Sequence, residues 1–78
     1  MARMYLQKLR EQRNETQQDV ANALGISRQY YAMIEDGSRQ KRMDILLVSR
    51  IADHFDVSVS DVIALEKEMN AEKKEDSA

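Results

Sequence analysis

Arg28 and Gln29 have the most specific chemistry in this chain, because they directly follow Ser27 at the predicted start of a helix. An arginine can make two parallel hydrogen bonds to guanine, and a glutamine can make two to adenine. Tyr30 could reach a phosphate or a thymine methyl group, and Met33 could make only apolar contact, so both are weaker candidates. The spacing favours a helix end that contacts base edges. The alternative is an ordinary solvated helix face.

The segment from residue 16 to residue 36 carries the signals of two short helices joined by a tight turn. Thr16 and Asp19 have the spacing of a capping box, and apolar residues follow on one helical face. Gly25 can end this first helix in the left-handed conformation, and Ser27 can cap a second helix that runs to about Asp36. Helices so closely joined must cross steeply, as in a helix-turn-helix unit. In DNA-binding versions of this unit, the second helix presents its amino end to the major groove.

Three further helices are predicted from apolar spacing and capping residues, and no strand signal is present. The first covers residues 3–13, with Leu6 and Leu9 inward. Asp44 caps the fourth, whose expected buried residues are Ile45, Val48, Ile51, Ala52 and Phe55. The fifth begins after Ser58, with Asp61 completing a capping box, and its apolar residues are Val59, Val62, Ile63, Leu65 and Met69. The prediction is an all-α domain of five helices over residues 1–69, with a charged, disordered tail over residues 70–78.

Length and composition limit the possible functions. The chain has 78 residues, which allow one domain with one small core and leave little room for a ligand pocket. It contains no cysteine and a single histidine, so we expect no metal site and no cofactor. No stretch approaches the roughly 20 apolar residues of a membrane span. We expect a cytoplasmic protein with no membrane partner and no small-molecule substrate.

Charge is distributed unevenly along the chain. The net charge is −2, but residues 1–50 carry nine Lys and Arg against six acids, whereas the rest carries three Lys against eight acids. The basic half includes Arg39, Lys41 and Arg42, which follow the predicted second helix of the pair and are candidates for neutralising phosphates. A flexible basic loop without a fixed partner is the competing interpretation.

The wider pattern resembles a known family. It consists of Leu9-Arg10, Thr16-Gln17, Val20-Ala21, Leu24-Gly25-Ile26-Ser27, Ile34-Glu35, Gly37, Ile51-Ala52 and Asp56-Val57-Ser58. This order resembles the Xre-type family of bacterial and phage repressors, which includes the Cro and lambda-repressor DNA-binding domains, over roughly residues 3 to 66. The resemblance implies a compact lambda-repressor-like fold with the helix-turn-helix at helices 2 and 3.

The resemblance also implies roles for particular residues. Gln17 corresponds to a residue that anchors a phosphate beside a helix amino end, and Arg10 and Glu35 correspond to a structural ion pair. Two positions depart from the family pattern: Tyr31 replaces an aliphatic core residue, so its hydroxyl must reach water or a partner, and Asp56 replaces a glycine. The candidate phosphate contacts are Gln17, Ser27, Arg39, Lys41 and Arg42.

These observations favour a sequence-specific regulator of double-stranded DNA, most simply a repressor that binds a two-fold-related operator as a homodimer. The apolar belt of the last helix offers candidate dimer contacts, or alternatively packs within the monomer; these residues are Val59, Ile63, Leu65 and Met69. A second interpretation is an antitoxin or another protein-interaction module with secondary DNA binding. An enzyme is the weakest interpretation, because no nucleophile-base pair or phosphate-binding glycine loop occurs.

Overall fold

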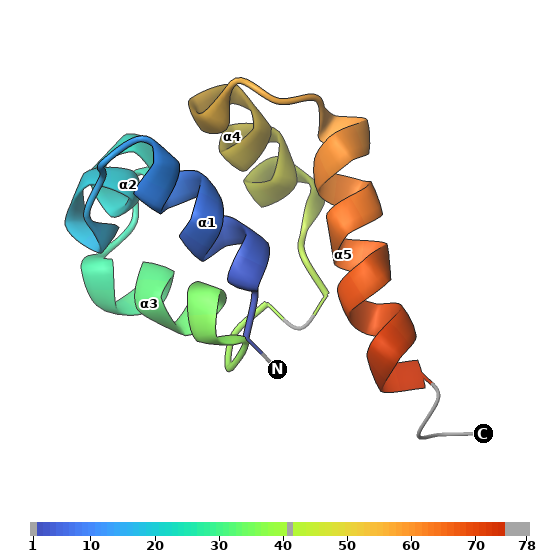
Figure 1. The fold of residues 1–78 in the computed structure, drawn as a ribbon. Helices are drawn as coiled ribbons and strands as arrows, with labels where there is room; N and C mark the ends of the chain where they lie inside the picture. The colour runs from blue at the N-terminus through green and yellow to red at the C-terminus, as the bar shows by residue number, and fades with distance from the viewer. Residues whose placement is uncertain (1, 41, 75–78) are drawn as a thin grey trace.

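The computed structural model describes residues 2–40 and 42–74, with side chains up to Met69. These residues form α helices and no strand (Figure 1). The helices are α1 (Met4–Gln12), α2 (Gln17–Leu24), α3 (Arg28–Asp36), α4 (Ile45–Phe55) and α5 (Val59–Lys74). The predicted all-α fold of five helices is confirmed.

Local capping fixes the unit formed by α2 and α3. The Thr16 side chain accepts a hydrogen bond from the backbone N–H of Asp19 at 3.1 Å, and the Asp19 carboxylate accepts one from the Thr16 N–H at 2.9 Å. Gly25 has φ 73°, in the left-handed region, and ends α2. Ser27 then caps α3 by accepting a hydrogen bond from the Tyr30 N–H at 3.1 Å. The predicted helix-turn-helix is confirmed at each of these positions.

Two further capping sites place α4 and α5. Asp44 caps α4 through the Leu47 N–H, at 2.8 Å, and Ser58 accepts a hydrogen bond from the Asp61 N–H, at 2.9 Å, at the start of α5. Between the two helices Asp56 has φ 57°, so it occupies the left-handed conformation that a glycine usually supplies at a helix end. Aspartate tolerates this region better than most residues with a Cβ. The turn between α4 and α5 therefore keeps its shape without the glycine.

All five helices contribute to one hydrophobic core. Figure 1 shows α5 beside α4, at the side of the group formed by α1, α2, α3 and α4. Burial of apolar surface is the main favourable contribution to folding, so the core determines how the helices are held together. The buried apolar residues are Leu6, Val20, Ala21, Leu24, Tyr31, Ile34, Leu47, Val48, Ile51, Ala52, Phe55 and Val62.

One predicted core residue is exposed. Ile45, the first residue of α4, has 73% of its surface open to solvent, whereas Leu47, at 7%, is buried. At 100° per residue, the buried residues of α4 from Leu47 to Phe55 occupy an arc of about 140°, and Ile45 falls just outside that arc. The prediction of a buried Ile45 was wrong because the spacing could not locate the edge of the buried stripe.

Tyr31 fills the core with its whole side chain. It is 0% exposed, so its hydroxyl does not reach the protein surface, and it makes no hydrogen bond of ordinary geometry with the described residues. The ring lies near Glu35, and the pKa of Tyr31 is raised, first by burial and then by this carboxylate. A buried hydroxyl without a partner costs free energy that an apolar ring would not.

Replacing Tyr31 by phenylalanine is expected to increase the free energy of unfolding by about 1 kcal/mol, because the variant removes the unpaired hydroxyl and keeps the ring. Urea denaturation followed by circular dichroism measures the change. A clear loss of stability in Tyr31→Phe would contradict this account and would indicate a hydrogen bond at the Tyr31 hydroxyl.

The last helix extends past the predicted end of the domain. The expected boundary between domain and tail was at residue 69, but α5 continues to Lys74. Residues 75–78 of the expected tail lie outside the described residues. Ala, Glu and Lys in this stretch have high helix propensity, which favours the continued helix.

Candidate nucleic-acid interface

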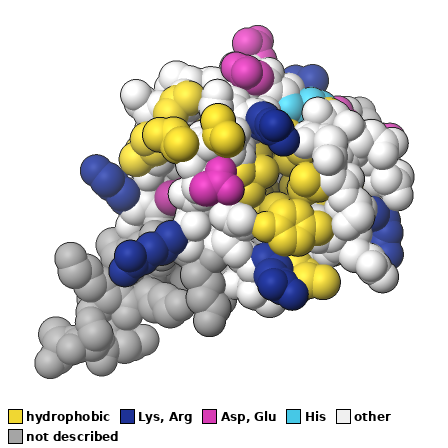
Figure 2. Space-filling model, turned by 180° about the vertical axis from the view of Figure 1, so that it is seen from behind, with side chains coloured by type: hydrophobic (Ala, Val, Ile, Leu, Met, Phe, Trp, Pro, Cys, Tyr) yellow, Lys and Arg dark blue, Asp and Glu magenta, His cyan; other side chains and the backbone are white. Residues whose placement is uncertain are grey.

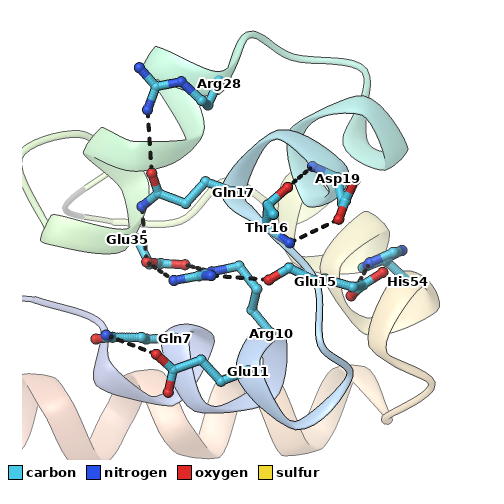
Figure 3. A network of polar contacts seen from close by, with 10 residues as sticks. All are labelled: Gln7, Arg10, Glu11, Glu15, Thr16, Gln17, Asp19, Arg28, Glu35 and His54. Atoms are coloured by element: carbon cyan, nitrogen blue, oxygen red, sulfur yellow. Dashed lines mark hydrogen bonds and ion pairs between the residues drawn. The ribbon is translucent and has the colours of Figure 1, made fainter.

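The amino end of α3 is open to solvent. Arg28 and Gln29, its first two residues, both have exposed side chains, and the Ser27 side chain is occupied by the cap. The Arg28 guanidinium donates a hydrogen bond of 3.5 Å to the amide oxygen of Gln17 on α2 (Figure 3). The helix end that was predicted to contact bases is therefore accessible, and Gln17 lies beside it.

Gln17 connects this helix end to a partly buried ion pair. Its amide nitrogen donates a hydrogen bond to Glu35 Oε1 at 3.2 Å. Arg10 donates to the same carboxylate from Nε at 2.9 Å and from Nη2 at 3.2 Å (Figure 3). The ion pair between Arg10 and Glu35, which the family resemblance implied, is present in the structure. Arg10 also donates to the backbone oxygen of Glu15, at 3.1 Å. These contacts join α1, α2 and α3, and Gln17 extends them to Arg28 at the amino end of α3.

The pKa of Glu35 reports on this network. Burial alone would raise the pKa of Glu35, but its polar neighbours, first of all the Arg10 guanidinium, lower it below its ordinary value of 4.5. The pKa of Arg10 is correspondingly raised, chiefly by its hydrogen bond to Glu35. Because the folded pKa of Glu35 lies below the unfolded one, the ionised carboxylate stabilises the fold above pH 4.5, and this stability is lost as the pH falls through the folded pKa.

Acidification below pH 4.5 is therefore expected to lower the free energy of unfolding more steeply in the wild type than in Glu35→Gln. The comparison isolates Glu35 from other carboxylates, such as Asp36, whose pKa is lowered by hydrogen bonds from Ser38. Thermal melts at a series of pH values supply the data. Parallel pH profiles for the two proteins would refute the role assigned to Glu35.

The basic loop follows α3. Arg39 and Arg42 have exposed side chains, and Lys41 lies outside the described residues. Gln40, which lies between Arg39 and Arg42 in the sequence, has φ 55°. Its side-chain Nε2 donates a hydrogen bond to the Tyr30 hydroxyl at 2.7 Å. The loop thus exposes charge while its backbone is attached to the domain.

A model of the helix-turn-helix family matches residues 6–62, which include α2, α3 and the loop after them. The chain belongs to the Xre/Cro-like helix-turn-helix family. This family consists of DNA-binding regulators and is not typically enzymatic. A comparison with curated proteins gives no match. No helix within residues 2–40 and 42–74 has the length and apolar character needed to cross a membrane.

Two of the four predicted base contacts of this helix-turn-helix protein, Tyr30 and Met33, are less exposed than Arg28 and Gln29. Tyr30 is half-buried, packs against the core and accepts the hydrogen bond from Gln40. Met33 is also half-buried. At the amino end of α3, Arg28 and Gln29 are thus the predicted base contacts with exposed side chains.

The predicted dimer contacts of α5 do not form a single patch. Leu65 and Met69 are half-buried and line a hollow beside the amino end of α1. Ile63 lines a different hollow, next to the basic loop, and Val59 is 37% exposed. Figure 2 shows apolar side chains open to solvent in more than one place on the rear face, among isolated basic residues. The apolar belt of α5 is thus divided between two surfaces.

Sequence reasoning missed the role of Arg3. It counted as one of the basic residues of the first half, yet it is only 1% exposed and forms an ion pair of 2.7 Å with Glu66 on α5. Local spacing gives no signal of this role, because Arg3 precedes α1 and its partner is 63 residues away in the sequence. Both Arg3 and Glu66 lie outside the segment that the helix-turn-helix family model matches.

Proposed function

We propose that this protein is a sequence-specific regulator of double-stranded DNA that represses transcription by occupying its operator. The observation that carries the proposal is the accessible amino end of α3, where Arg28 and Gln29 are exposed beside Gln17. The family match supports DNA binding by this unit. Repression by occupancy needs no chemical step, in keeping with a domain that only binds.

The proposed contacts divide into two kinds. Arg28 and Gln29 enter the major groove, where their side chains can make paired hydrogen bonds to guanine and adenine. Gln17 is the first residue of α2, so a phosphate there meets unpaired backbone N–H groups and the positive end of the helix dipole. The amide nitrogen of Gln17 uses one hydrogen for Glu35, and its second hydrogen can be donated to a phosphate. Ser27, Arg39, Lys41 and Arg42 complete the proposed phosphate contacts.

Two copies of the domain are part of the proposal. A single recognition helix reads only a few base pairs, and useful specificity in a genome requires more. A two-fold dimer would place two α3 helices in successive major grooves about one helical turn apart. The proposed dimer contacts are on α5: Leu65 and Met69 beside one hollow, Ile63 beside the other, and the exposed Val59.

Selection of bound duplexes from a random DNA pool tests this function directly. The expected result is an enriched motif with two-fold symmetry and half-site centres about one helical turn apart. Sedimentation with and without the selected duplex then gives the number of protein copies bound. Failure of the purified chain to enrich any sequence would contradict the proposal and would favour the protein-interaction alternative.

A further inference from the structure

The guanidinium of Arg3 is almost fully enclosed and uses all its N–H groups. Nε and Nη2 hold the Glu66 carboxylate at 2.7 and 3.3 Å. Nη1 donates to the backbone oxygens of Ile34, at 2.8 Å, and Arg39, at 3.2 Å, and Nη2 also donates to that of Gln40. The three nitrogens therefore make five hydrogen bonds, the full capacity of an arginine.

These contacts join segments that are distant in the sequence. Arg3 precedes α1, Ile34 lies near the end of α3, Arg39 and Gln40 belong to the basic loop, and Glu66 lies on α5. The backbone N–H of Arg3 is held as well, because it donates to the backbone oxygen of Glu35 at 2.7 Å. We call this arrangement, formed by Arg3 and Glu66 with the carbonyl groups they hold, the Arg3 clasp.

Gln40 in the loop has an unfavourable backbone conformation that several contacts hold. Gln40 adopts φ 55°, a left-handed conformation that is unfavourable for a residue with a Cβ. Its side chain contacts the Tyr30 hydroxyl and accepts a hydrogen bond from the Asp44 N–H at 3.2 Å, and its carbonyl is held by Arg3. Such a conformation persists only where surrounding contacts over-determine it. The Arg3 guanidinium supplies the contact to the backbone of Gln40.

We propose that Arg3, oriented by Glu66, is a positioning residue that fixes the loop after α3 so that Arg39 and Arg42 meet the DNA backbone. The inference rests on the proposed DNA-binding function and assigns to α5 and the residues before α1 a part in it. The exposed side chains of Arg39 and Arg42 carry the positive charge, and the buried Arg3 clasp determines their position. An arginine is required, because lysine has neither the planar fork nor enough donors for five acceptors.

The test compares Arg3→Lys and Glu66→Gln with the control Tyr5→Phe. The Tyr5 hydroxyl also donates to Glu66 but makes no hydrogen bond to the loop, so Tyr5→Phe removes a hydrogen bond of the carboxylate and none of the loop. Circular dichroism identifies the temperature at which each variant is folded. Two readouts follow at that temperature: the amide NMR signals of the loop without DNA, and the salt dependence of binding to the duplex selected by the wild type. Should Arg3→Lys fail to fold, Glu66→Gln carries the comparison.

In Arg3→Lys, the amide signals of residues 39, 40 and 42 are expected to shift. The salt slope, which is the slope of the logarithm of the binding constant against the logarithm of salt concentration, should become shallower by about one to two units. Base preference should be kept. Glu66→Gln should show the same changes to a smaller extent, and Tyr5→Phe should keep the wild-type slope. A folded Arg3→Lys with unchanged loop signals or an unchanged salt slope overturns the inference. Equal flattening in Tyr5→Phe overturns it too. If the wild type binds no DNA, the proposed function fails, but a loop shift in Arg3→Lys still supports the clasp.

Discussion

Replacing Arg10 by methionine is expected to lower the free energy of unfolding by about 3–5 kcal/mol. The variant leaves the Glu35 side chain, which is 9% exposed, with the hydrogen bond from Gln17 but without its counterion. An enclosed charge without its counterion is costly, and small domains are stable by only about 5–15 kcal/mol. Most of the stability of this domain should therefore be lost. Urea denaturation at neutral pH measures the effect.

Two controls separate the loss of an enclosed ion pair from the loss of charge alone. Arg13→Met breaks the exposed pair with Glu15, where 45% of the arginine side chain is open, and should cost less than about 1 kcal/mol. The double variant Arg10→Met with Glu35→Leu should be more stable than Arg10→Met, because no carboxylate is left enclosed. Equal losses in Arg10→Met and Arg13→Met would show that the ion pair between α1 and α3 contributes nothing special.

Gln29→Ala is expected to relax base preference at one or two positions of each half-site. A paired hydrogen bond to a base contributes about 1–3 kcal/mol of discrimination, so preference at the contacted position should fall about tenfold or more. The side chain is exposed, so stability should change little. Competition binding against single-base variants of the selected duplex measures the preference.

Matched substitutions define what that result means. Gln12→Ala removes an exposed glutamine at the end of α1, outside the helix-turn-helix, and should leave preference and affinity unchanged. Arg42→Ala should weaken binding to all sequences alike and reduce the salt slope by about one unit, because it removes charge rather than a base contact. If Gln29→Ala behaves as Arg42→Ala does, Gln29 contacts the backbone and the assignment of base contacts must be revised.

The helix-turn-helix was predictable because local interactions specify it. The capping box of Thr16 and Asp19, the left-handed Gly25 and the Ser27 cap each act within a few residues, so their spacing in the sequence is enough. The partnership of Arg10 and Glu35 joins residues far apart in sequence. It was anticipated only through resemblance to a family, because no local rule places one beside the other.

The features that sequence reasoning missed depend on tertiary packing. Tyr30 has an apolar ring with a polar end, and only the packed loop decides that its hydroxyl meets Gln40. Ile45 has the spacing of a core residue but stands at the edge of the buried arc. A charged residue such as Arg3 is seldom enclosed without a partner, and the partner, Glu66, is 63 residues away. Long-range ion pairs of this kind leave little trace in a single sequence.

The position of the Arg3 clasp has a consequence for engineering. A minimal domain trimmed to residues 6–62 would keep the recognition helix and the support from Arg10 and Glu35, but would lose Arg3 and Glu66 together. Likewise, grafting α2 and α3 onto another scaffold would transfer the determinants of base choice without the device that sets the loop. Chimeras and truncations of this protein should therefore separate specificity from affinity.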